Sequence, residues 1–90
     1  MQIECAFFGP LRDPVGQKTV SRELDAGATV GDLLADLERV YEDLDLLEDG
    51  DRREHLTITV EGKDVRHLEG VDTELEDGTL VRLTTAVYGG

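Results

Sequence analysis

The stretch Thr29–Leu44, TVGDLLADLERVYEDL, decides the fold, because it is the clearest helix in the chain. Thr29 is a good N-cap residue, and Asp32 three positions later makes a variant of the capping box. Apolar residues then recur at helical spacing and form one stripe: Val30, Leu33, Leu34, Leu37, Val40, Tyr41 and Leu44. Acidic residues fill much of the other side. The stripe has no other partner, so we predict that this helix covers a sheet.

Four segments on either side of the helix have the alternating pattern of strands: residues 2–8, 17–25, 56–61 and 79–85. Their inward-facing residues are expected to be Ile3, Cys5, Phe7, Val20, Leu24, Leu56, Ile58, Val60, Val81 and Leu83. The first two strands, joined by the turn-rich residues 9–16, form a hairpin. Gly62-Lys63-Asp64 is expected to turn the chain, residues 65–68 to be a short extended piece, and residues 70–75 to be irregular or a single turn.

This order of elements predicts an α+β domain over residues 1–85, in which a mixed sheet of four or five strands packs on one main helix. That arrangement is the β-grasp, or ubiquitin-like, fold. Residues 86–90 are expected to leave the domain as a flexible tail. The tail ends on two glycines, Gly89 and Gly90.

The charge of the chain restricts its partners. The 21 acidic residues outnumber nine basic ones, which gives a formal net charge of −12, and Lys18 and Lys63 are the only lysines. Such a surface repels phosphate backbones, so direct binding of nucleic acid is not expected. Acidic residues spread along the whole chain suggest a halophilic protein from a salt-rich, haloarchaeal cytoplasm. The alternative is a mesophilic acidic protein that binds a basic partner.

A salt titration of folding distinguishes these two hypotheses. At about 1 M salt the Debye length falls to about 3 Å, so the repulsion between like charges is screened. For the halophilic hypothesis we expect the unfolding midpoint, measured by circular dichroism, to rise steeply towards molar salt. A chain that is equally stable at low salt would contradict that hypothesis.

Several classes of protein are not expected. No apolar stretch approaches the roughly 20 residues that cross a membrane, and the N-terminus lacks the pattern of a secretory signal, so a soluble cytoplasmic protein without membrane partners is expected. The single cysteine, Cys5, excludes an internal disulfide and a four-cysteine metal site, and its place in the alternation predicts a buried side chain.

No catalytic or metal site is expected either. The acidic residues 45–56 fail as a calcium loop, because Leu47 and Leu56 stand where two side-chain oxygens are needed, so a solvated loop is expected. His55 and His67 lack a third ligand at metal spacing. The phosphate-binding glycine loop and the serine nucleophile elbow are both missing. The chain is therefore not expected to be an enzyme.

The reactive group of the chain is instead predicted to be the α-carboxylate of Gly90. Glycine has no Cβ, so Val87-Tyr88-Gly89-Gly90 can thread a narrow channel and present an unobstructed carbonyl carbon. The alternative is a frayed terminus with no role. The outward face of the sheet is a candidate partner surface, and its residues are Phe8, Thr57, Thr59, Arg82 and Thr84. Scattered surface residues are the alternative there.

The chain resembles the prokaryotic ubiquitin-like β-grasp family, which includes the molybdopterin synthase small subunit, the thiamine-pathway sulfur carrier and the small archaeal modifier proteins. The segments that carry the resemblance are 6–16 (AFFGPLRDPVG), 28–34 (ATVGDLL), 55–63 (HLTITVEGK), 75–78 (LEDG) and 89–90 (GG). The resemblance spans nearly the whole chain.

The resemblance implies that an E1-like activating enzyme uses ATP to adenylate Gly90, and that the chain itself binds no cofactor. The adenylate is then converted to a thiocarboxylate for sulfur transfer, or passes to a lysine of a target protein as an isopeptide bond. A desampylating metalloprotease would remove the modifier. Lys18 and Lys63 are candidate acceptors if chains of the modifier form.

One departure from the family pattern bears on function. Thr84-Thr85-Ala86 stands where molybdopterin synthase small subunits usually carry an aromatic and two prolines, and Thr57 replaces an apolar residue. These changes disfavour a dedicated partner of the molybdopterin synthase large subunit. The first hypothesis is therefore a protein modifier. The second is a sulfur carrier for molybdopterin biosynthesis or tRNA thiolation, and the third is a non-covalent acidic interaction domain.

Overall fold

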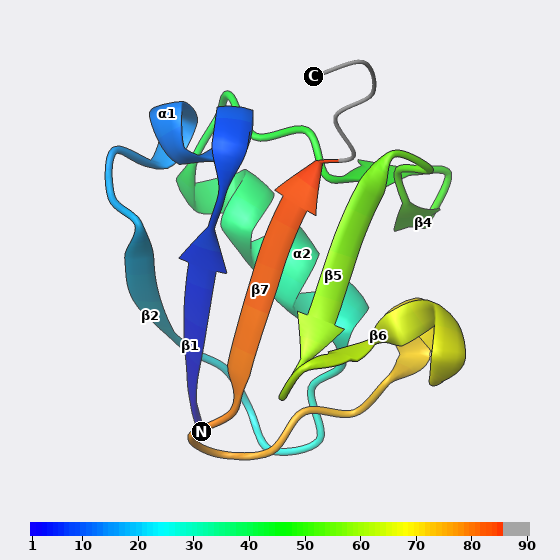
Figure 1. The fold of residues 1–90 in the computed structure, drawn as a ribbon. Coiled ribbons are helices and arrows are strands. Elements are labelled where there is room, and N and C mark those ends of the chain that lie inside the picture. Colours follow the sequence, from blue (N-terminus) through cyan, green and yellow to red (C-terminus); the bar gives the residue numbers. More distant parts are fainter. Residues whose placement is uncertain (86–90) are drawn as a thin grey trace.

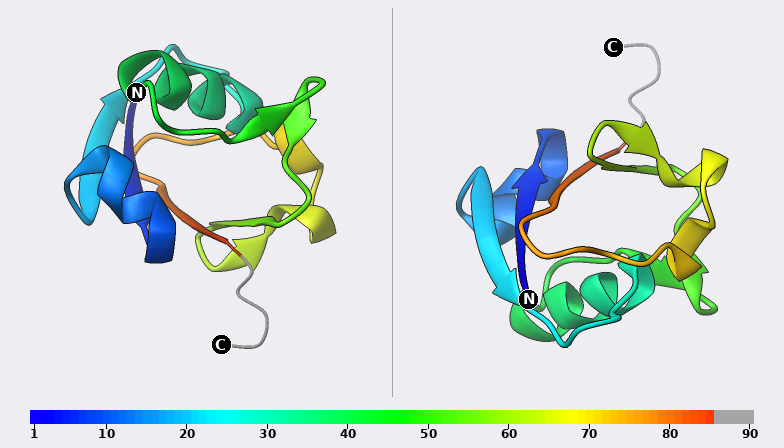
Figure 2. Two further views of the ribbon diagram at one scale, coloured as in Figure 1. Left: turned by 90° about the horizontal axis from the view of Figure 1, so that it is seen from above. Right: turned by 90° about the horizontal axis from the view of Figure 1, so that it is seen from below.

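The computed structural model describes residues 1–85 of the 90-residue chain. Its main sheet has five strands in the order β2-β1-β7-β5-β6. These strands are β1 (Gln2–Phe7), β2 (Thr19–Glu23), β5 (Leu56–Val60), β6 (Lys63–Asp64) and β7 (Leu80–Thr85). The helix α2 (Val30–Val40) lies across one face of this sheet, as Figures 1 and 2 show. The predicted mixed sheet on one main helix is confirmed.

The first and last strands of the described chain lie side by side in the middle of the sheet. β1 and β7 run parallel, with Cys5 opposite Val81 and Phe7 opposite Leu83 (Figure 1). β2 pairs antiparallel with β1, as the predicted hairpin requires, and β5 pairs antiparallel with β7. The expected strand ends differ by a few residues, because β2 covers Thr19–Glu23 rather than residues 17–25.

Both signals at the start of the helix are confirmed. The Asp32 backbone N–H donates to Thr29 Oγ1 at 3.3 Å, and the Thr29 N–H donates to Asp32 Oδ2 at 2.9 Å. This capping box satisfies two backbone donors that a helix otherwise leaves without partners. The apolar side of α2 then faces the sheet, and its fully buried residues are Val30, Leu33, Leu34 and Leu37.

The predicted end of the apolar stripe is wrong. The helix stops at Val40, because Tyr41 has an extended backbone, and the Val40 side chain is 38% exposed. Leu44 still reaches the core, from the turn that follows the helix. Gly31, in the first turn, allows a close approach: a Cβ there would lie 3.3 Å from Val71 Cβ in the single turn η3 (Gly70–Asp72).

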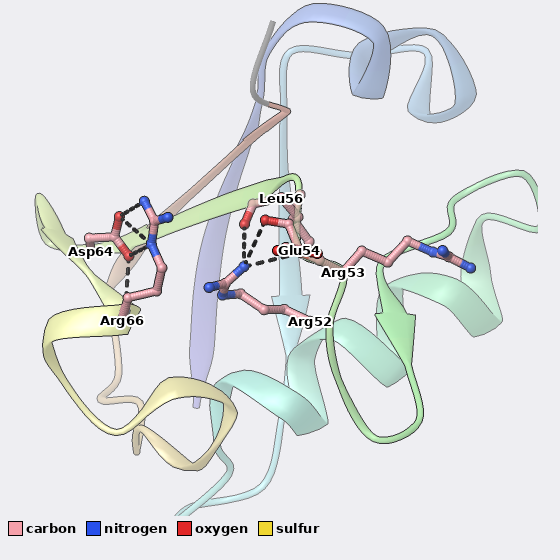
Figure 3. A network of polar contacts seen from close by, with 6 residues as sticks. All are labelled: Arg52, Arg53, Glu54, Leu56, Asp64 and Arg66. Atoms are coloured by element: carbon pink, nitrogen blue, oxygen red, sulfur yellow. Dashed lines mark hydrogen bonds and ion pairs between the residues drawn. The ribbon is translucent and has the colours of Figure 1, made fainter. Parts of the chain in front are cut away.

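Two short segments form helical turns where none were expected. The predicted loop 9–16 contains η1 (Gly9–Leu11) and α1 (Arg12–Val15), because Leu11 and Val15, four residues apart, both bury their side chains. Residues 65–68 are not extended: η2 (Val65–His67) begins where Asp64 Oδ1 accepts a hydrogen bond from the Arg66 N–H at 2.9 Å. The Arg66 guanidinium also lowers the pKa of Asp64 to about 2 (Figure 3).

The acidic connection between α2 and β5 is more ordered than a solvated loop. It contains a small hairpin of β3 (Leu47–Glu48) and β4 (Asp51–Arg52), and Leu46 beside it is fully buried. Arg52 holds the end of this segment, since its Nη1 donates to backbone carbonyls at 3.0–3.3 Å (Figure 3). Those carbonyls belong to Arg53, Glu54 and Leu56. The clamp fixes the entry into β5.

The turn between β5 and β6 is displaced from its predicted place. Val60 pairs with Lys63, so the two turn residues are Glu61 and Gly62, and Lys63 and Asp64 form β6. Both turn residues have positive φ, 50° and 82°, which is the geometry of a tight hairpin turn and favours glycine.

None of the helices within residues 1–85 is long and apolar enough to span a membrane.

An ion-pair network ties β2 to α2. Asp36 accepts hydrogen bonds from Arg22 Nε at 2.6 Å and from Arg39 Nη2 at 2.6 Å. The hydrogen bond from Arg22 is the main reason why the pKa of Asp36 lies below its ordinary value of 3.8. The Asp36 side chain is only 11% exposed, so the contact is partly shielded from solvent.

We expect Asp36→Asn to lower the free energy of unfolding by about 1–3 kcal/mol at pH 7, since charged hydrogen bonds contribute on that scale. Because the folded state lowers the pKa of Asp36, its contribution is present above about pH 4 and is lost as the pH falls through the folded value. Chemical denaturation at several pH values checks this.

Asp43→Asn is the matched control, because Asp43 is exposed and the substitution removes the same charge. The difference in the free energy of unfolding between the Asp36→Asn variant and wild type should disappear as the pH falls below about 4. A gap of constant size down to low pH would show that the ionised carboxylate is not what stabilises this contact.

Candidate functional site

The uncovered face of the sheet carries a shallow groove that extends along β7 and β5, from Thr84 near the end of β7 to the turn at Gly62. Its volume is about 380 Å³, and we call it the outer-face groove. The groove is lined by Phe8, Thr57, Thr59, Gly62, Arg82 and Thr84. The structure therefore brings together all five residues of the predicted partner surface and adds Gly62.

Strand alternation places these side chains outward. On β7, Val81 and Leu83 are fully buried against the core, whereas Arg82 between them is exposed. On β5, Ile58 is fully buried, and its neighbours Thr57 and Thr59 are half-buried on the other face. Figure 2 shows that α2 lies on only one side of the sheet, so within the described chain the outward side chains have no covering helix.

The strand register sets the order of the groove residues. Thr57 lies opposite Thr84, and Thr59 lies opposite Arg82. The Phe8 backbone N–H donates to the Leu83 carbonyl at 3.1 Å, which places Phe8 next to Thr84. Arg82 lies opposite Ala6, so Phe8 and Arg82 are diagonal neighbours on adjacent strands, with backbone positions about 7–8 Å apart.

The charge at the groove is positive, in contrast to that of the chain as a whole. Lys18 Nζ lies 5.7 Å from the centre of the Phe8 ring, within the range of a cation–π contact. The residues that pair with Arg82 across the sheet are Ala6 and Thr59, and neither is a carboxylate. Among residues 1–85, Arg82 has no ion-pair partner.

This set of groups can bind but offers no means of catalysis. Threonine hydroxyls, a guanidinium and an aromatic ring supply hydrogen bonds, charge and apolar contact, but no paired nucleophile and base. Within the described chain, no group of three or more His, Cys, Asp or Glu residues could hold a metal ion. His55 and His67 are exposed, as expected of surface or loop histidines.

Two further surface hollows within the described residues have a different character. One lies at the segment 24–28 before α2 and includes Asp25 and Asp32, and the other includes Glu61, Glu74 and Glu76. Both are lined by carboxylates, whereas no carboxylate lines the outer-face groove. The groove therefore differs in charge from the other hollows.

The buried cysteine is unsuited to nucleophilic chemistry. Cys5 is fully buried on β1, which confirms its predicted place in the core. Burial, with a smaller contribution from the charge of Glu4, raises the pKa of the Cys5 thiol to about 12. The reactive thiolate is therefore scarce near neutral pH.

We expect the native protein to react very slowly with Ellman's reagent at pH 8 and to react fully once it is unfolded in guanidinium chloride. Both the burial of Cys5 and its raised thiol pKa protect it. The absorbance of the released thiolate measures the reaction. A fast reaction of the folded chain would show that Cys5 is accessible.

The remaining predicted site residues fall into two groups. Lys18 and Lys63 are both exposed, Lys18 before β2 and Lys63 on β6. Val87, Tyr88, Gly89 and Gly90 lie outside the described residues. Sequence reasoning missed Gly62 as a lining residue, although its place in the turn after the outward row of β5 is the signal that could have found it. It also missed the position of Lys18 over Phe8, for which the sequence holds no local signal.

The fold defines the class of the protein: it is a ubiquitin-like β-grasp protein. A family model described as the ThiS family matches residues 5–90, and the chain belongs to this family. The resemblance inferred from the sequence segments is thereby confirmed.

Known relatives are similar over most or all of their length. The chain is 41% identical to small archaeal modifier protein 3 of Haloferax volcanii, and the match covers all of both chains. The solution structure of the Haloferax volcanii HVO 2177 protein has a TM-score of 0.89 and 40% identity, over 100% of this chain and 87% of that one. A chain of the BexX/CysO complex from Amycolatopsis orientalis has a TM-score of 0.83 and 27% identity, over 98% and 99%. The protein is thus similar to small modifiers and carriers.

Proposed function

We propose that this protein is a ubiquitin-like modifier that is joined through Gly90 to lysines of target proteins. The observation that carries the proposal is the full-length similarity to small archaeal modifier protein 3, at 41% identity. In this proposal an E1-like enzyme activates the Gly90 carboxylate with ATP, and the modifier itself binds no cofactor. Gly89 gives the preceding peptide the conformational freedom to enter the activating site.

The chemistry needs little from the chain beyond an accessible carboxylate. A carboxylate oxygen of Gly90 attacks the α-phosphate of ATP, and pyrophosphate leaves. A target lysine amine then attacks the carbonyl carbon, an isopeptide bond forms and AMP leaves with the bonding electron pair. Glycine has no side chain to obstruct either approach. The activating enzyme supplies the catalytic groups.

The position of the groove supports a docking role for the outer face. Thr85, the last residue of β7, directly follows the groove residue Thr84, and Gly90 is five residues further on. Five residues span at most about 18 Å, so a partner seated on the groove has the Gly90 carboxylate within reach. We therefore assign the outer-face groove as the surface that partner proteins contact while they act on the C-terminus. In the solved BexX/CysO complex, a related small chain forms part of an assembly.

Deletion of Gly89 and Gly90 tests the proposal. We expect an epitope-tagged chain to form higher-mass conjugates in a host that holds the activating enzyme. The truncated chain should form none, because its terminal carboxylate then belongs to Tyr88 instead of Gly90. Immunoblots of denatured lysates, followed by peptide mapping of the Gly90 linkage, measure the outcome. Conjugates that persist after truncation would rule out linkage through Gly90.

The matched control is Lys18→Arg with Lys63→Arg, which leaves the C-terminus intact. Conjugation to target proteins should be unchanged in this variant, and any ladder of modifier chains built on these exposed lysines should disappear. Treatment with a metalloprotease that removes the modifier would abolish both the conjugates with target proteins and the ladder of modifier chains.

A sulfur carrier is the second candidate, and membership of the ThiS family favours it. In this case the adenylate is converted to a thiocarboxylate for molybdopterin biosynthesis or tRNA thiolation. Intact mass spectrometry of protein from its native host would show the exchange of one oxygen for sulfur. Thr57 and Thr84 in the groove provide little apolar surface for the molybdopterin synthase large subunit, which weighs against that one pathway.

A non-covalent acidic interaction domain is the third hypothesis, in which partner binding survives loss of the glycines.

A further inference from the structure

The arrangement of cations on this acidic protein singles out the outer-face groove. Four arginines lie within 2.8 Å of a carboxylate oxygen: Arg22 and Arg39 pair with Asp36, Arg53 with Asp45, and Arg66 with Asp64. Those cations neutralise charges of the chain itself. Arg82 and Lys18 pair with no carboxylate among residues 1–85; Arg82 lines the groove, and Lys18 lies over the ring of the lining residue Phe8.

The other cations do not weaken this distinction. Arg52 uses its guanidinium on backbone carbonyls next to β5 (Figure 3). Arg12 and Lys63 have no ion pair among the described residues, but neither of them lines the outer-face groove or makes the cation–π contact that places Lys18 over Phe8. Only at the outer-face groove do unpaired positive charges in residues 1–85 coincide with an aromatic ring.

The nearby carboxylates of the same face are already engaged. Glu4 lies opposite Leu80, one outward row from Arg82, and its Oε1 accepts a hydrogen bond from Ser21 Oγ at 2.7 Å. Glu61 Oε1 accepts from the Leu80 backbone N–H at 3.0 Å. Both carboxylates are held by short hydrogen bonds within their own row. The Arg82 side chain is exposed and forms no ion pair among residues 1–85.

We infer that the outer-face groove binds a partner segment in which an apolar side chain and a carboxylate point to the same side. The apolar side chain packs on Phe8 beneath Lys18, and the carboxylate pairs with Arg82 between the hydroxyls of Thr59 and Thr84. This inference deepens the docking role assigned above and rests on it. It names the chemistry of the partner, an acidic and apolar protein segment.

The spacing of the two contacts defines the segment more closely. The backbone positions of Phe8 and Arg82, which are diagonal neighbours on adjacent strands, are about 7–8 Å apart, close to the roughly 7 Å between residues i and i+2 of an extended strand. An extended segment with the pattern apolar–any–acidic therefore places both side chains on the groove at once. The middle residue points away and is left unspecified.

The net charge of −12 decides between two kinds of anionic partner. A nucleic acid presents a continuous row of phosphates, which the acidic surface around the groove repels. A single carboxylate in a protein segment meets only the local charges of Arg82 and Lys18. At about 1 M salt the long-range repulsion is screened over about 3 Å, while a contact pair within the groove persists. We therefore favour a protein segment.

An NMR titration tests the inference. A peptide is added to the full ¹⁵N-labelled chain in about 1 M KCl, and the chemical shifts of the backbone amides are measured at each step. The probe is an acetylated heptapeptide, Leu-Ser-Asp-Ser-Leu-Ser-Asp, which repeats the pattern. Its matched versions carry Asn or Lys in place of Asp, and a single-stranded oligonucleotide serves as the phosphate polyanion. We expect saturable shifts at groove residues with the Asp peptide, weaker ones with Asn, and none with Lys or the oligonucleotide.

Arg82→Gln should weaken binding of the Asp peptide roughly tenfold, since hydrogen bonds to charged groups contribute on that scale. Arg39→Gln is the matched control: it makes the same charge change on α2, at a side chain that is 70% exposed. Its affinity should equal that of wild type. A chain without Gly89 and Gly90 should bind equally well, so this result is independent of conjugation through the C-terminus.

Four outcomes would overturn the inference: equal or tighter binding of the Lys peptide, equal binding of the oligonucleotide, an Arg82→Gln variant with unchanged affinity, or no saturable shift in the groove. The first would assign a basic partner and the second a nucleic acid. If Arg82→Gln abolished conjugation but left peptide binding unchanged, Arg82 would act in conjugation by some means other than pairing with a carboxylate of the partner segment.

Discussion

The whole structure depends on the central pairing of β1 with β7 over a single helix. The inward side chains of these strands, among them Cys5, Val81 and Leu83, are fully buried under α2. Burial of each large apolar side chain stabilises the fold by about 1.5–3 kcal/mol. Because side chains alternate along a strand, a slip of one residue in β7 would place Arg82 under the helix. The register is therefore strongly specified, and with it the set of residues that faces outward.

On this acidic chain, the cations fall into two groups: those that pair with carboxylates of the chain and those that do not. Arg22 joins β2 to α2 through Asp36, and Arg66 holds Asp64 at the start of η2, so both have a structural role. Arg82 and Lys18 contribute to no such contact within the described chain. On a chain with a net charge of −12, these two cations at the outer face support the docking role proposed for that face. The single helix leaves that surface open.

Much of the fold was predictable because its signals are local. The capping box at Thr29, the apolar side of α2 and the alternation of β1, β5 and β7 all follow from the spacing of neighbouring residues. The errors lie where a hydrogen bond from a backbone N–H to a side chain overrides a short pattern. Residues 65–67 form a helical turn because Asp64 caps it, and Leu46 is buried because Glu38 Oε2 accepts hydrogen bonds from the N–H groups of Leu46 and Leu47 at 2.8 and 3.0 Å.

The sequence by itself determined which side chains share a face, where the helix begins, how acidic the surface is, and that two glycines follow the last strand. Alternation and helical periodicity are properties of adjacent residues, so they need no further information. Only the tertiary structure decided that β1 and β7 are parallel neighbours, that Phe8 lies beside Thr84, and that Lys18 lies over Phe8. Those relations join distant parts of the chain, and local periodicity does not specify which strands become neighbours.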